Sequence, residues 1–244
     1  MAARLFVDRA LTEGDEFALP AGAARHVQVL RLQPGAELRI FNARGGESAA
    51  SVTHMGRSEV RVRVGARDAV ERELARGVTL AVGMPANERM DALIEKATEL
   101  GASAIVPLMC ERSVLRLQGE RADKKLAHWR GVAIAACEQS GRTRVPLLAP
   151  VASLTQWLQG LPPPGADSRF VLSLGESRPL AQLSGNEPRR PALVLSGPEG
   201  GLSPAEEALA RWHGFTPAGL GPRVLRADTA PLAALAWLAI QDGY

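Results

Sequence analysis

The spacing of apolar residues changes near residue 70, and this change constrains the fold more than any other feature of the chain. Before it, short segments alternate apolar and polar residues, most clearly in 60–64, where valines alternate with arginines. Such alternation indicates half-buried strands. From Val78 onward, near-continuous apolar runs alternate with helical patterns, which indicates a parallel sheet covered on both faces. The sequence therefore predicts a small β domain over 1–70 and an α/β domain over 71–244.

The first of these regions combines short strands with a single helix. Turn signals such as Pro34-Gly35 separate its apolar segments. A helix over 23–32 should turn Val27, Val29 and Leu30 inward. Small barrels of this kind are common RNA-binding modules, although the pattern also suits a purely structural barrel. The strands we expect are 4–7, 16–19, 37–41, 47–54 and 59–65.

The second region should form five buried strands and several helices. A helix over 90–100 has one apolar side, and a second over 122–140 buries Trp129 and its neighbours. The last helix begins near Thr229 and is small and apolar, with Trp237 on it. Its partner is either the core of the domain or a second subunit. The strands we expect are 78–82, 104–108, 170–174, 192–196 and 219–225.

A glycine-rich turn at 196–203 follows one of these buried runs. Its glycines leave room for a ligand against the backbone, and Pro198 stiffens the turn between them. Ser203, Pro204 and Glu206 then form the pattern of a capped helix start with a capping box. Strand, glycine turn and helix in this order are typical of ligand sites at the carboxyl ends of strands. A tight connection without a ligand has the same pattern.

Composition limits the other classes of protein. The chain has 46% hydrophobic residues, enough for a proper core, and no apolar stretch reaches the roughly 20 residues of a membrane span. Its start lacks the apolar core of a signal peptide. Cys110 and Cys137 form no Cys-x-x-Cys pair, so neither a disulfide framework nor a zinc site is indicated. We therefore expect a globular cytoplasmic protein.

Positive charge gathers in one segment of a chain whose net charge is only +3. Between Arg112 and Arg144, basic residues clearly outnumber acidic ones. This pattern suits a surface that faces phosphates, and equally an ordinary solvated helix face. The four histidines are isolated, no metal-ligand spacing occurs, and no nucleophile motif is present. An enzyme of this kind would rely on a bound cofactor for its reactivity.

Three blocks of sequence resemble a known family: 90–101, 138–142, and 197–203 together with 220–226. Together, and with the amino-terminal segments 4–6 and 26–31, they resemble the RsmE-type ribosomal RNA small subunit methyltransferases of the SPOUT superfamily. The resemblance covers essentially the whole chain. It implies a PUA-like RNA-binding β-barrel followed by a SPOUT-type α/β trefoil-knot domain. It also implies a homodimer that uses S-adenosylmethionine to methylate N3 of one uridine in the 16S rRNA of the small ribosomal subunit.

The resemblance also implies where the cofactor binds. The chemistry of the transfer suggests which groups act on the base, because the N3 proton must be lost and the charge on the ring stabilised. Arg226 would stabilise charge on a uracil oxygen, with Asp228 or Glu138 orienting it or receiving the proton. Alternatively, Arg226 and Asp228 form a structural pair that caps the last helix. The family usually has Thr-Glu-Thr-Ala-Ala where this chain has Ala-Asp-Thr-Ala-Pro at 227–231, so Asp228 has the shorter reach. The implied cofactor residues are Leu174, Gly175, Gly197, Glu199, Gly200, Gly201, Leu220, Gly221, Leu225 and Arg226.

For the RNA we expect contacts from arginines in both regions of the chain. Two other functions remain open: a methyltransferase of the same superfamily with another target, such as a ribose hydroxyl, and a non-catalytic ribosome-assembly factor that binds RNA. Failure to bind S-adenosylmethionine would favour the assembly factor. The expected RNA-binding residues are Arg4, Arg25, Arg31, Arg112, Arg142 and Arg144.

Overall fold

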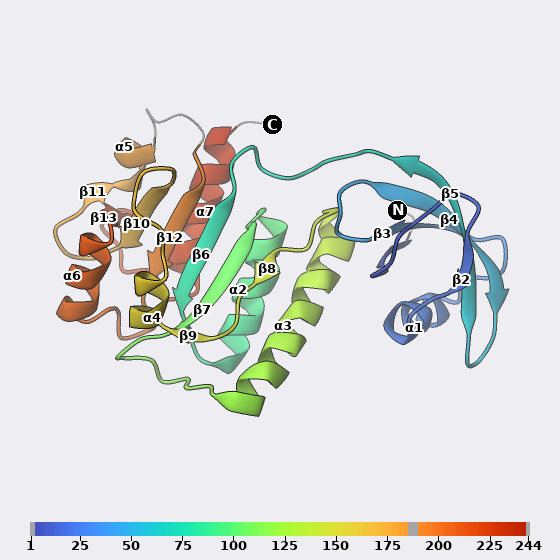
Figure 1. Cartoon of the computed structure of the whole chain (residues 1–244), viewed down its shortest axis with the longest axis horizontal. Coiled ribbons are helices and arrows are strands. Elements are labelled where there is room, and N and C mark those ends of the chain that lie inside the picture. Colours follow the sequence, from blue (N-terminus) through green and yellow to red (C-terminus); the bar gives the residue numbers. More distant parts are fainter. Residues whose placement is uncertain (1–2, 185–189, 243–244) are drawn as a thin grey trace. The chain divides into compact units, whose positions relative to one another are not determined.

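The structure, a computed structural model, describes residues 3–184 and 190–242 (Figure 1). The chain forms two compact units. The first unit comprises Met1–Glu73 together with Cys137–Val145, and the second comprises Leu74–Ala136 and Pro146–Tyr244. The last turn of helix α3 (Gly119–Ser140) thus belongs to the first unit, although the rest of this helix belongs to the second.

The first unit is a five-stranded sheet with the strand order β1-β3-β4-β5-β2 and one helix. Strands β1 and β3 are parallel, and the other pairs are antiparallel. The alternation predicted at 60–64 is confirmed, because Val60, Val62 and Val64 are buried in the core of this unit. The elements are β1 (Ala3–Phe6), β2 (Glu16–Ala18), α1 (Ala21–Val29), β3 (Glu37–Phe41), β4 (Glu47–Met55) and β5 (Val60–Asp68).

Fewer apolar residues of α1 are buried than its sequence indicates. Val27 is fully buried as expected, but the prediction for Val29 and Leu30 was wrong, since these side chains are 71% and 46% exposed. The helix ends at Val29, and Leu30 already forms its C-cap. Arg31 then takes a positive φ of 54°, which turns the chain away from the helical path.

The second unit is built on a parallel sheet with the strand order β11-β13-β10-β12-β6-β7-β8, and β9 also pairs with β7. Every pairing in it is parallel. Consecutive residues of β6 and β12 are buried, so both faces are covered, as predicted. The strands are β6 (Val78–Gly83), β7 (Ala104–Met109), β8 (Leu147–Leu148), β9 (Ala152–Ser153), β10 (Ser168–Leu172), β11 (Arg178–Pro179), β12 (Ala192–Ser196) and β13 (Thr216–Gly219).

Helices complete the second unit, and one of them carries exposed apolar residues. In α7, Leu235 and Leu238 are buried, whereas Trp237 and Ile240 are 37% and 72% exposed. Within the described chain, no helix is long and apolar enough to cross a membrane. Besides α3, the helices are α2 (Asn87–Glu99), α4 (Leu154–Gln159), α5 (Leu180–Ser184), α6 (Pro204–Trp212) and α7 (Thr229–Asp242).

Two strands of this sheet end earlier than predicted. The run 219–225 is not a strand, because β13 covers Thr216–Gly219 and the residues after it form a loop. Gly221 has a φ of 104° and Pro222 follows it, a pair that ends strand geometry. Similarly, β10 ends at Leu172, so Leu174 lies in a loop. Loops therefore follow the carboxyl ends of β10, β12 and β13.

Candidate functional site

A cavity of about 690 Å³ lies at the carboxyl ends of β10, β12 and β13, entirely within the second unit. The loops that follow these strands supply most of its lining, which runs through 172–175, 196–199 and 218–227. Nine of the ten predicted cofactor residues line it, and the exception is Gly200. The resemblance thus identified residues that the fold brings together from three separate loops.

The glycine turn is folded tightly on itself, which accounts for its composition. A Cβ on Gly197 would lie 2.6 Å from the backbone nitrogen of Leu202, so no larger residue fits without a shift of the loop. Arg112 stabilises the turn with two hydrogen bonds, because its Nη1 donates to the carbonyls of Gly200 at 2.9 Å and Leu202 at 3.3 Å. Gly200 therefore packs against Arg112 and contributes nothing to the cavity wall.

A capping box fixes the end of the turn, as predicted. The Ser203 hydroxyl accepts from the Glu206 nitrogen at 3.3 Å, and the Glu206 carboxylate accepts from the Ser203 nitrogen at 2.9 Å. The Glu206 carboxylate also accepts from the backbone nitrogen of Glu111 at 2.7 Å. These bonds hold the start of α6, and with it the glycine turn, at the end of β7.

Glu199 connects the same turn to the start of α2. Its Oε1 accepts a hydrogen bond from the Ala86 nitrogen at 3.0 Å and lies 3.8 Å from Nη1 of Arg89. Arg89 is itself a lining residue of the cavity. Glu199 therefore joins the glycine turn to a cationic group on a different element.

Two polar atoms at the site are buried without a hydrogen-bond partner. The Ser196 side chain lines the cavity, its residue is 2% exposed, and its Oγ is unpaired. Oδ1 of Asp228, next to the lining residue Ala227, is also unpaired. An unpaired buried polar group costs about 1–3 kcal/mol. A ligand that offers hydrogen-bonding groups would relieve this cost.

Arg226 lines the cavity from the loop that precedes α7. Its carbonyl accepts from the nitrogens of Thr229 and Ala230, both at 3.0 Å, and so begins the helix. Among the residues that the structure describes, no hydrogen bond or ion pair joins the side chains of Arg226 and Asp228. The alternative of a structural pair is therefore not formed, and the guanidinium group of Arg226 is available to a ligand.

Glu138 belongs to the first unit and is not among the residues that line the cavity. Its Oε1 accepts a hydrogen bond from the Phe6 nitrogen at 2.9 Å, and its Oε2 lies 3.6 Å from Nδ1 of His26. Burial raises the pKa of this carboxyl above its usual range, and the Phe6 hydrogen bond opposes the shift. Glu138 thus links the end of α3 to β1 through the hydrogen bond that it accepts from the Phe6 nitrogen.

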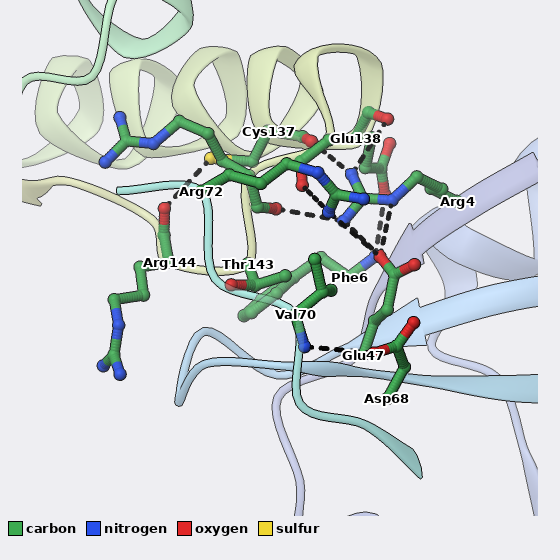
Figure 2. Close-up of polar contacts among 12 residues, drawn as sticks. Arg4, Phe6, Glu47, Asp68, Val70, Arg72, Cys137, Glu138, Thr143 and Arg144 are labelled. Carbon is green, nitrogen blue, oxygen red and sulfur yellow. Dashed lines mark hydrogen bonds and ion pairs between the residues drawn. The ribbon is translucent and has the colours of Figure 1, made fainter. Parts of the chain in front are cut away.

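Two of the six predicted RNA-binding arginines are mostly shielded from solvent in the first unit: Arg142 is buried, and the side chain of Arg4 is 10% exposed. The guanidinium group of Arg4 contacts the carboxylate of Glu47 at 2.8 Å and the Cys137 carbonyl at 2.7 Å (Figure 2). Arg142 has a side chain only 4% exposed and forms an ion pair with Glu73. These cations hold together segments that lie far apart in the sequence.

The other four arginines are exposed. Arg144 pairs with Glu71 at 2.9 Å, with its side chain half exposed. Arg25 and Arg31 have no carboxylate partner within the described ranges. Arg112 is exposed, and its guanidinium group donates to two carbonyls of the glycine turn.

Sequence reasoning missed five polar lining residues: Arg89, Ser173, Ser177, Ser196 and Arg223. Ser196 and Arg223 lie inside the motifs singled out above, so attention to every polar residue of those motifs would have found them. Arg89 lies in the first turn of α2, outside the glycine motif, and no local pattern marked it.

The two cysteines are poor nucleophiles, because burial raises the pKa of Cys110 to about 12 and that of Cys137 to about 11.

Two family models match the chain, one in each region. The model for an RNA methyltransferase PUA domain matches 19–65, and the model for an RNA methyltransferase domain matches 72–239. The predicted fold class is confirmed: a PUA-like β domain precedes a SPOUT-type α/β domain with a parallel sheet.

Three relatives match this chain over nearly their whole length. The Bacillus subtilis protein named ribosomal RNA small subunit methyltransferase E is 33% identical, over 95% of this chain and 92% of its own. The crystal structure of the Neisseria gonorrhoeae protein of that name, bound to S-adenosyl methionine, has a TM-score of 0.89 at 32% identity, covering 97% of this chain and 96% of that one. A Legionella pneumophila protein in complex with the same cofactor has a TM-score of 0.91 at 33% identity, covering 98% and 97%. The chain belongs to the ribosomal RNA small subunit methyltransferase E family.

Proposed function

We propose that this protein transfers a methyl group from S-adenosylmethionine to N3 of one uridine in the 16S rRNA of the small ribosomal subunit. The observation that carries the proposal is the cavity formed by the three loops, in a chain that aligns from end to end with relatives solved with this cofactor. The names of the relatives supply the class of substrate, and the family resemblance supplies the uridine nitrogen.

The residues of the cavity fit this cofactor. Its volume of about 690 Å³ falls within the range of roughly 300–1,000 Å³ that small-molecule sites occupy. The glycine turn keeps side chains away from one wall, and the unpaired Ser196 hydroxyl offers a hydrogen bond inside it. When bound, S-adenosylmethionine supplies a methyl group activated by a positively charged sulfur.

The task left to the protein is to align the base and to remove the N3 proton. Alignment supports an in-line displacement, and the neutral imide nitrogen has no available lone pair until its proton is lost. The Arg226 guanidinium group stabilises the negative charge that then develops on a uracil oxygen. Asp228, with its unpaired Oδ1, orients that group or receives the proton. Glu138, which does not line the cavity, is the second candidate acceptor, because a raised pKa makes its carboxylate a stronger base.

RNA contacts come in this proposal from the exposed arginines, namely Arg25, Arg31, Arg112 and Arg144. Arg4 and Arg142 support the first unit from inside. Residues 1–70 serve as the RNA-binding domain and 71–244 as the catalytic domain. A homodimer would cover the exposed Trp237 and Ile240 of α7, and the ribosomal substrate implies a cytoplasmic protein.

Incubation of unmodified small subunits with labelled S-adenosylmethionine tests the proposal. Label should enter the 16S rRNA, and mapping by nucleoside mass spectrometry should give a single 3-methyluridine. Methylation of a ribose hydroxyl instead would show that the protein is a methyltransferase with a different target atom. A protein that binds RNA but no cofactor would overturn the proposal in favour of an assembly factor.

A further inference from the structure

Three arginines from two different segments line the cavity. Arg89 comes from the first turn of α2, and Arg223 and Arg226 come from the loop after β13. The only carboxylate among the lining residues is that of Glu199. Glu176 lies between two lining residues, but it does not line the cavity itself. The wall therefore carries more positive than negative charge.

The proposed cofactor does not account for this excess. S-adenosylmethionine has one carboxylate, one ammonium group and one sulfonium, so it is itself a cation at neutral pH. Its one carboxylate needs at most one donor group, which a backbone N–H can supply as well, and several arginines together would repel the cofactor. Arg226 is already assigned to the uracil oxygen. The remaining guanidinium groups are placed for an anion that approaches the cavity from outside.

Arg89 and Arg223 are both available to such an anion. Arg223 is exposed and has no carboxylate partner within residues 3–184 and 190–242. Arg89 has a side chain 40% exposed and lies 3.8 Å from Glu199, which is too long for a direct hydrogen bond. Glu199 in turn is held by the Ala86 nitrogen at 3.0 Å. The carboxylate thus restrains Arg89 while leaving its N–H donors open.

We infer that Arg89 and Arg223 bind phosphates of the RNA strand next to the target nucleotide, and that Glu199 is the positioning residue for Arg89. This inference rests on the proposed function, since it takes RNA as the substrate. Arginine suits the role because its fork of N–H donors matches phosphate oxygens. Glu199 lies in the glycine turn and also contacts Arg89. Its carboxylate therefore connects the turn proposed to bind the cofactor with the arginine proposed to bind the RNA strand.

The variants Arg89→Gln and Arg223→Gln test the inference, with Arg121→Gln as the matched control on an exposed position of α3 outside the cavity. The probe is an unmodified 16S rRNA transcript, bound over a series of salt concentrations. Each cavity variant should lower the RNA affinity about threefold to fivefold and reduce the slope of log affinity against log salt by roughly one unit. The affinity for S-adenosylmethionine should stay within about twofold of the parent value.

Two results would overturn the inference. The first is that both cavity variants have the same RNA affinity and the same salt slope as the control Arg121→Gln. The other is a parallel loss of cofactor affinity, which would assign the arginines to the cofactor. The parent protein separates this from the proposed function: a parent that neither binds the cofactor nor methylates the subunit refutes the function, whereas an active parent with unaffected variants refutes only the inference.

The positioning role of Glu199 needs a coupled measurement. If Glu199 acts through Arg89, the Arg89→Gln change should cost less RNA affinity in a Glu199→Ala background than in the parent. Glu199→Gln keeps an acceptor for the Ala86 nitrogen but removes the charge, so it separates loop support from restraint of Arg89. Independent, additive effects of the two substitutions on RNA affinity would show that Glu199 does not position Arg89.

Discussion

Arginines of the first unit and arginines of the cavity wall do different work with the same side chain. In the first unit, Arg142 is buried, Arg4 is largely buried, and both are bound to carboxylates. On the cavity wall, Arg223 and Arg226 are exposed and have no carboxylate partner in the described part of the chain. The comparison shows that the partners of an arginine, and not its charge, separate the arginines that support the fold from those that are available to a ligand.

The largest effect on stability should come from Arg142→Ala. Removing this side chain leaves Glu73, itself largely buried, without its ion-pair partner, and breaking a buried pair costs about 3–5 kcal/mol. Urea unfolding followed by circular dichroism measures the loss. The matched control is Arg144→Ala, because that half-exposed pair with Glu71 should contribute about 1 kcal/mol or less. Equal losses in both variants would contradict the comparison.

The largest effect on turnover should come from Arg226→Ala. Removing a group that stabilises charge in the transition state lowers kcat by about 100-fold to 1,000-fold. The affinity for S-adenosylmethionine should change little, and the free energy of unfolding should shift by less than about 0.5 kcal/mol, because the side chain is exposed. Single-turnover methyl transfer and equilibrium binding measure the two quantities. An equal loss of both would remove Arg226 from the catalytic step.

A smaller effect is expected for Ser196→Ala. The variant removes a buried hydroxyl that has no partner, so the protein without cofactor should become as stable as the parent or more stable. The affinity for S-adenosylmethionine should fall by about fivefold, the value of one hydrogen bond. Thermal unfolding with and without cofactor gives both results. A stability loss with unchanged cofactor affinity would show that the hydroxyl supports the fold.

The smallest effect concerns the pH dependence of stability through Glu138. Because burial raises its pKa in the folded state, its favourable contribution is present below the usual value of 4.5 and is lost as pH rises through the raised value. Glu138→Gln keeps an acceptor for the Phe6 nitrogen and cannot ionise. Its stability relative to the parent should therefore increase as pH rises from below 4.5 through the raised pKa of Glu138.

The control for Glu138→Gln is His26→Gln, which removes the nearby imidazole and keeps the carboxyl. That variant should become less stable than the parent as the carboxyl ionises. A flat difference between Glu138→Gln and the parent across this range would show that burial does not disfavour the charged carboxylate. Methyl-transfer rates of Glu138→Gln also test its role as proton acceptor, since a supporting role leaves turnover largely unchanged.

Local patterns predicted the elements well where a residue's neighbours in sequence are also its neighbours in space. The capping box of Ser203 and Glu206 is confirmed, and so is the alternation at 60–64. The run 219–225 was wrong because apolar residues that line a cavity have the same composition as a buried strand. The error thus fell on part of the candidate site, since residues 219–225 all line the cavity.

The candidate site depended on more than periodicity. The resemblance assigned the three loops, and nine of its ten cofactor residues line one cavity. Arg89 was missed because it enters that cavity from another segment, where no motif marks it. The roles assigned to Arg226, Asp228 and Glu138 stay predictions, as does the division of the chain at residue 70.

By itself, the sequence determined the two kinds of sheet, the capped helix after a glycine turn, and the family to which the blocks point. Only the tertiary structure decided which arginines are buried and which remain available. Arg4 finds its partner 43 residues away and Arg142 finds Glu73 69 residues away. An ion pair depends on distance in space and on burial, and neither quantity can be read from separation along the chain.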